Sequence, residues 1–189
     1  SMASEGVRFT NAFANNAVCS PTRATYLTGL TPSQHGVHRY LGKGRLQIGP
    51  QASYTLEEFT TLPEVLHREG YVCGLSGKWH LGDNANPQDG FSFWVTKQHG
   101  HSLGFLNQEV LEDGKFKMIP QHLSEYWTDR GIEFVQTAQR EHADKPFFLF
   151  LAYNGPYSLA GAMLEEVPSP WSDPYRDSDL SSFPRPKKI

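Results

Sequence analysis

A run of apolar residues at positions 147–153, Phe-Phe-Leu-Phe-Leu-Ala-Tyr, constrains the fold more than any other feature. The run has the length of a strand and falls far short of the roughly 18 apolar residues of a transmembrane helix. Because it lacks alternating polar residues, it is typical of a parallel strand buried on both faces. We therefore predict a central strand of a parallel sheet here, and we find no segment that predicts a membrane span.

The elements around this run alternate between strand and helix patterns, which predicts an α/β fold with a mostly parallel sheet flanked by helices. Asp113-Gly114 lies in the middle of a hairpin pattern at 109–118. Residues 31–54 and 83–105 have the composition of loops. The expected strands are 7–13, 71–75 and 147–153, and the expected helices are 19–28, 61–69 and 124–142.

The length of 189 residues suits one domain with a hydrophobic core, with an irregular Pro- and Ser-rich tail at 164–189. A net charge of -3 argues against a nucleic-acid binder, which normally carries a strong basic excess. The two cysteines, Cys19 and Cys73, are too few for a disulfide framework. We expect them not to be bridged, because Cys73 lies inside a predicted strand.

Three groups of polar residues fall where an α/β sheet places its ligands, at helix starts and at the ends of strands. In the first group, Cys19 begins a predicted helix with Pro21 in its first turn and Arg23 one turn on. Free amide groups at a helix start and an arginine fork suit sulfate or phosphate, with Cys19 as a nucleophile. The alternative is an ordinary helix with a buried thiol.

The second group follows the predicted strand 71–75 and contains Lys78 and His80. Lys78 offers positive charge and His80 can exchange a proton near neutral pH. A P-loop is excluded because Trp79, and not Ser or Thr, follows the lysine. The third group, with Asn154 and Tyr157, follows the apolar run. A solvated lysine, a structural histidine and a plain turn are the alternatives for these two groups.

The segment Cys19-Ser20-Pro21-Thr22-Arg23 with Leu27-Thr28-Gly29 resembles the signature of the sulfatase family. Gly77-Lys78-Trp79-His80-Leu81-Gly82 resembles the second signature of that family, and the likeness extends in order from about residue 4 to residue 157. The resemblance implies part of the catalytic domain of an alkaline-phosphatase-like sandwich. It also implies a sulfuric ester hydrolase that acts on sulfate esters of a sugar or an aryl alcohol.

The resemblance further implies that Cys19 is oxidised to formylglycine by a formylglycine-generating enzyme. Hydration of this aldehyde gives a diol, one hydroxyl attacks sulfur, and the second expels sulfate as the aldehyde re-forms. Calcium, or alternatively magnesium, binds the diol. Arg23, Lys78 and His80 match the family residues that act on the diol and the sulfate. The substrate-binding residues expected here are Lys78, Asn154 and Tyr157, and Cys19 as formylglycine is the expected metal ligand.

Two departures from the family pattern affect these expectations. The carboxylate metal ligands of the family fall outside this chain, since no Asp-Asn pair occurs near Asp173, Asp177 or Asp179. We therefore expect an internal fragment that is inactive on its own. Tyr157 stands where many members have a histidine assigned to the leaving group. His99 and His101 are alternative proton donors that the sequence does not rank.

The family resemblance also implies a secreted, periplasmic or lysosomal location and a sulfated small molecule or glycan as the partner. Two alternatives stay open. A phosphonate or phosphodiester hydrolase can share the Cys-x-Pro-x-Arg signature, and the chain can also be a non-catalytic fragment.

Overall fold

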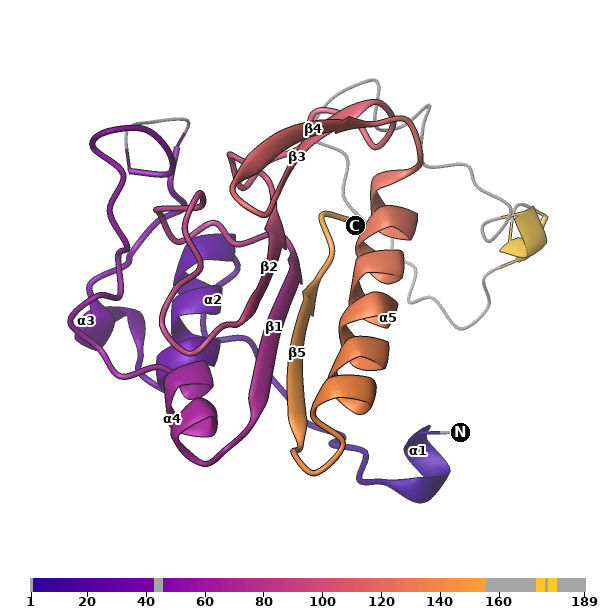
Figure 1. Cartoon of the computed structure of the whole chain (residues 1–189), viewed down its shortest axis with the longest axis horizontal. Helices are drawn as coiled ribbons and strands as arrows, with labels where there is room; N and C mark the ends of the chain where they lie inside the picture. The colour runs from indigo at the N-terminus through magenta and orange to yellow at the C-terminus, as the bar shows by residue number, and fades with distance from the viewer. Residues whose placement is uncertain (1, 43–45, 156–172, 176, 180–189) are drawn as a thin grey trace, which may run out of the picture.

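The fold was determined as a computed structural model, which describes the chain except for residues 1, 43–45, 156–172, 176 and 180–189. Its described strands form one mixed sheet in the order β4-β3-β2-β1-β5 (Figure 1). The strands are β1 (Val72–Gly77), β2 (Phe93–Thr96), β3 (Gln108–Glu112), β4 (Lys115–Ile119) and β5 (Phe147–Ala152). The helices are α1 (Met2–Glu5), α2 (Cys19–Thr28), α3 (Pro32–His35), α4 (Leu62–Arg68), α5 (Leu123–Glu141) and the 3-10 turn η1 (Asp173–Tyr175).

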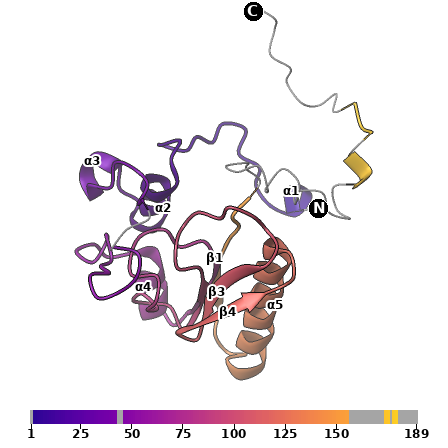
Figure 2. The same ribbon diagram turned by 90° about the horizontal axis from the view of Figure 1, so that it is seen from above.

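The sheet separates two helical layers. Figure 2 shows α2, α3 and α4 on one side of the sheet and α5 on the other. Strand β1 pairs in parallel with both β2 and β5, whereas β3 and β4 add an antiparallel hairpin at one edge. This arrangement confirms the predicted α/β class with a sheet flanked by helices.

Strand β1 is almost completely buried and lies between β2 and β5. Cys73 and Leu75 are completely buried and pack in the cluster of α2 and α4, while Gly74 lies against the ring of Phe134 on α5. Because its two neighbours are parallel strands and helices cover both of its faces, β1 has the environment that the sequence predicted for residues 147–153.

Strand β5 exists at the predicted position, but the prediction that it is buried on both faces is wrong. Phe147 is 40% exposed, and of the strand residues only Ala152 is buried. The physical reason is its place in the sheet, since β5 pairs with β1 along one edge and with no other described strand. The apolar run therefore predicts a strand correctly, but it does not predict how many strands pair with it or how deeply its side chains are buried.

Three further expectations were wrong. Residues 7–13 form no strand, and Val7 and Phe13 are 81% and 90% exposed because no described strand pairs with them. Conversely, β2 lies inside the segment predicted as loop, where Trp94 and Val95 are buried between β1 and β3. The segment 31–54 also contains the short helix α3.

Local signals located the helix ends correctly. Helix α4 begins with the expected capping box, in which the Glu64 carboxylate accepts from the backbone N–H of Thr61 at 2.7 Å. Helix α2 runs from Cys19 to Thr28 and is capped by Gly29, whose φ of 72° is the left-handed conformation that favours glycine. Among the described residues, no helix is both long and apolar enough to cross a membrane.

The end of β1 approaches β5 closely at Gly77. This residue has a φ of 119°, and a Cβ atom added there would collide with the backbone carbonyl of Ala152. The same carbonyl accepts a hydrogen bond of 2.7 Å from the N–H of Lys78. A side chain at position 77 would therefore push apart the two strand ends from which Lys78 and Asn154 follow.

We predict that Gly77→Ala lowers the free energy of unfolding by roughly 2–6 kcal/mol, since a left-handed backbone and a steric clash each cost about 1–3 kcal/mol. Urea denaturation followed by circular dichroism measures the change. Gly42→Ala is the control, because a Cβ there meets nothing within 4 Å and its φ is not positive. Equal midpoints for the two variants would contradict the close packing of β1 and β5.

Candidate active site

Cys19 is the first residue of α2, and the first turn of this helix is fixed to the segment that follows β1. The hydroxyl of Ser20 donates to the carbonyl of His80 at 2.8 Å, and Nη1 of Arg23 donates to the carbonyl of Lys78 at 2.5 Å. The free amide groups of the helix start therefore face the same region as the loop after β1. The structure thus brings together the first two groups of residues that the sequence singled out.

Lys78 is only 4% exposed, and its side chain hydrogen bonds to that of Cys19. Burial lowers the pKa of Lys78, the nearby positive charge of Arg23 lowers it further, and the interaction with Cys19 raises it. A buried amine beside the sulfur of Cys19 provides a donor for a negatively charged group at this position.

His80 is completely buried and has a positive φ of 65°. Its Nε2 lies 2.7 Å from the carbonyl of Leu41, and because a carbonyl only accepts, Nε2 carries the hydrogen. Nδ1 therefore holds a lone pair, and it has no hydrogen-bond partner among the described residues. Burial lowers the pKa of His80 to about 3, with smaller contributions from the charges of Lys78, His101 and Arg23. The ring is neutral at pH 7.

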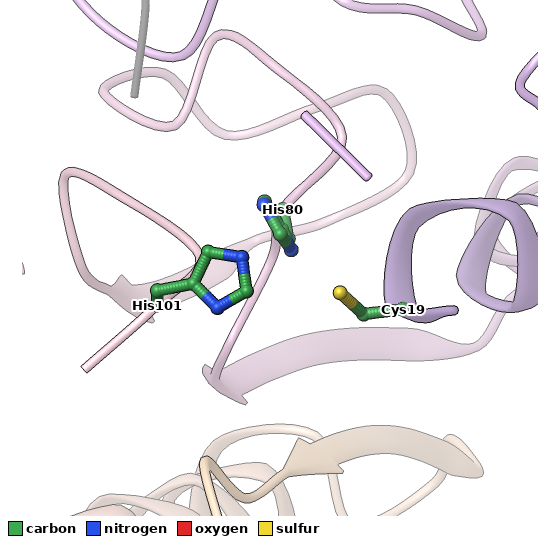
Figure 3. Close-up of side chains that lie close together, drawn as sticks. All are labelled: Cys19, His80 and His101. Atoms are coloured by element: carbon green, nitrogen blue, oxygen red, sulfur yellow. The ribbon is translucent and has the colours of Figure 1, made fainter. Parts of the chain in front are cut away.

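His101 joins this site from the loop after β2. One ligand atom each of Cys19, His80 and His101 lies within 4.8 Å of the other two, and Figure 3 shows the three side chains converging. The rings of His80 and His101 meet edge to face with centroids 4.8 Å apart. The sequence offered His99 and His101 without ranking them, and the cluster contains His101.

Asn154 lies at the end of β5, as predicted, and is 1% exposed. Its side-chain oxygen accepts from the indole N–H of Trp127 at 3.1 Å, and its amide nitrogen donates to the carbonyl of Gly100 at 3.3 Å. These bonds connect β5, α5 and the loop that carries His101. A contact between Asn154 and substrate stays a prediction, and Tyr157 lies outside the described residues.

A cavity of about 560 Å³ opens beside Cys19. Cys19, Arg23 and Lys78 line it together with Tyr26 and with the end of β5 near Tyr153. Two cationic side chains and the helix start give the cavity a positive potential next to the sulfur atom. An anionic group of the size of sulfate or phosphate fits this environment chemically.

The described residues do not provide a calcium site of the kind that the family resemblance implies. Within this part of the chain, the group of three or more His, Cys, Asp or Glu side chains close enough to share a metal is Cys19, His80 and His101. Calcium prefers six to eight oxygen ligands, and this group contains no carboxylate. Asp173, Asp177 and Asp179 are exposed and do not belong to the group.

The two cysteines are both free, which confirms the expectation that they are not bridged. Cys73 is buried on β1, where its thiol lies 3.7 Å from the carbonyl of Pro63. Burial raises the pKa of Cys73 to about 11. Cys19 is partly exposed at the cavity, so the chain separates one enclosed thiol from one accessible thiol.

The chain resembles known proteins along most of its length. Residues 1–183 match the family model "Sulfatase". An arylsulfatase of Hemicentrotus pulcherrimus is 32% identical over 80% of this chain, and the N-acetylglucosamine-6-O-sulfatase of Bacteroides thetaiotaomicron is 30% identical over 82%. A protein solved in complex with its substrate D-glucosamine-2-N,6-O-disulfate is also similar. Its sequence is 28% identical to this chain, and the two structures match with a TM-score of 0.65 over 82% of this chain.

The chain spans 31%, 25% and 28% of the lengths of these three proteins. It therefore corresponds to about a quarter to a third of a protein of their size. The match covers the helix start with Cys19 and the segment with Lys78 and His80. By its sequence match and its fold, the chain belongs to the sulfatase family.

Proposed function

We propose that this chain carries the nucleophile and anion-binding residues of a sulfatase that hydrolyses sulfate esters of a sugar or an aryl alcohol. The observation that carries the proposal is the position of Cys19 at the start of α2, with Lys78 hydrogen-bonded to its side chain and Arg23 one turn on. The names of the relatives support sulfate esters, and a solved relative contains a sulfated sugar.

In this proposal the sulfur of Cys19 marks the place of a formylglycine side chain. The hydrated aldehyde supplies an oxygen nucleophile and a second oxygen that allows sulfate to leave. A helix start without acidic residues in its first turn and the accessible position of Cys19 at the cavity accommodate such a group. Conversion of Cys19 would require a formylglycine-generating enzyme as a partner during maturation. We propose with it a secreted, periplasmic or lysosomal location.

The roles of the surrounding residues follow from their charge and hydrogen bonds. Lys78 binds an oxygen of the sulfate group, because it is a buried donor directly beside Cys19. Arg23 fixes the loop of Lys78 through its bond to the Lys78 carbonyl and contributes positive charge. His80 acts as a neutral ring whose Nδ1 accepts a proton or a hydrogen bond from the nucleophile.

Calcium or magnesium would provide Lewis-acid activation in this chemistry. Among the residues that the structure describes, only the oxygen of a modified Cys19 is a family-like ligand, so the other ligands would be supplied by residues outside this described part.

A phosphonate or phosphodiester hydrolase is the alternative within the same fold. Lys78 and the start of α2 offer donors that suit sulfate and phosphate alike. Comparing kcat/KM on nitrophenyl sulfate and on a nitrophenyl phosphodiester, with a protein of full length, separates the two reactions. A higher value on the sulfate supports our proposal, and a higher value on the phosphodiester overturns it.

We predict that Cys19 is converted to formylglycine when the chain is expressed with a formylglycine-generating enzyme. Peptide mass spectrometry of the segment around Cys19 detects the aldehyde, and Cys73 is the internal control because it is buried and should stay a thiol. Pro21→Ala and Arg23→Ala should lower the converted fraction. Recovery of Cys19 only as a thiol from a competent host would contradict the assignment.

We predict that the isolated chain does not hydrolyse nitrophenyl sulfate, even with Cys19 fully modified and calcium added. A single oxygen ligand cannot hold an ion that takes about six to eight, so the charge of the sulfate group would not be neutralised. The assay compares the modified chain with its Cys19→Ala variant. Turnover that disappears in Cys19→Ala would show that the chain builds its own metal site.

A further inference from the structure

We propose that the chain, while Cys19 is still a thiol, binds a zinc-like divalent ion through Cys19, His80 and His101, and that modification of Cys19 abolishes this site. The inference concerns the form that precedes any catalytic activity. Metal binding by the thiol form stands or falls independently of the function proposed above, whereas its loss on modification rests on the proposed conversion of Cys19.

The three ligand atoms come from three separate segments that the fold brings together. Cys19 begins α2, His80 follows β1 and His101 follows β2. In a tetrahedral zinc site with Zn–S of about 2.3 Å and Zn–N of about 2.0–2.1 Å, neighbouring ligand atoms lie roughly 3.3–3.6 Å apart. Since the atoms here already lie within 4.8 Å of one another, a rotation of the partly exposed Cys19 and His101 side chains is enough to close the site.

His80 is the preorganised ligand of this set. Its Nε2–H donates to the carbonyl of Leu41, and the lone pair on the buried Nδ1 has no partner in the part of the chain that the structure describes. Metal-binding histidines commonly donate their second ring N–H to a backbone carbonyl in this way, which fixes both tautomer and ring orientation. The backbone of Gly100 packs against the ring, and a Cβ at that position would overlap it.

The ligand set selects the class of metal. One thiolate and two neutral imidazoles suit zinc, cobalt and related ions, and they do not suit calcium or magnesium, which prefer oxygen. Three protein ligands leave a fourth position for water. Binding releases one proton, because Cys19–SH and M²⁺ give Cys19–S⁻–M²⁺ and H⁺.

Positive charge near the site limits its strength. Lys78 hydrogen bonds to the Cys19 side chain and Arg23 lies close by, so both oppose a divalent cation. The thiolate compensates one of these charges. The site is therefore weaker than a closed structural zinc site, and an ion that forms a strong bond to thiolate is required.

The experiment is a Co²⁺ titration of the reduced full chain, in which a sulfur-to-cobalt charge-transfer band in the near ultraviolet reports a thiolate ligand. We expect this band in the unmodified chain, its loss on adding Zn²⁺, and its persistence in excess Ca²⁺. Cys19→Ser should eliminate the band. His101→Ala should weaken Co²⁺ binding at least about tenfold, since even the loss of a residue that only supports a ligand costs that much.

Cys73→Ser and His99→Ala are the matched controls and should keep the band, because neither residue belongs to the cluster. Far-ultraviolet circular dichroism verifies that each variant is folded. The proposal is overturned if a folded unmodified chain shows no band, if the band survives Cys19→Ser, or if His99→Ala and His101→Ala weaken binding equally. The formylglycine form should show no band whether or not it supports sulfatase activity.

Discussion

The attachment of α2 to the segment after β1 is the interaction on which the site depends. Two hydrogen bonds, from Ser20 to the carbonyl of His80 and from Arg23 to the carbonyl of Lys78, join the helix start to the end of the central strand. Because these acceptors belong to the backbone of Lys78 and His80, the side chains of both residues stay available on the side of Cys19. The helix that begins with Cys19 and the loop that contains Lys78 are thus held together as a single unit.

The sequence predicted helix ends and turns correctly, because these depend on interactions between residues close together in the chain. The capping box of Thr61 and Glu64, the left-handed Gly29 and the hairpin at Asp113-Gly114 all involve residues a few positions apart, and all three occur as expected. Elements that depend on pairing partners were harder to predict. Strand β2 is short and surrounded by glycine and asparagine, and it forms because β1 and β3 pair with its two edges.

The same distinction applies to the site. Lys78 and His80 were identifiable because they follow a strand in a recognisable pattern, and the structure brings both close to Cys19. The choice of His101 over His99 as the neighbour of His80 depends on how the loop after β2 folds back. Nothing in the spacing of the two histidines indicates which ring faces the cluster. The internal hydrogen bonds of Asn154 were likewise invisible, since their partners lie 27 and 54 positions away.

Gly100 shows how a residue without functional groups can limit variation at this site. Its N–H donates to the side chain of Gln47 at 2.9 Å and its carbonyl accepts from Asn154, so the backbone is held from both sides against the ring of His80. A single added methyl group would therefore have to displace the ring, although no charge, ligand or hydrogen bond is altered. Gly100 is thus a position that restricts substitution at the site although its own side chain carries no chemistry.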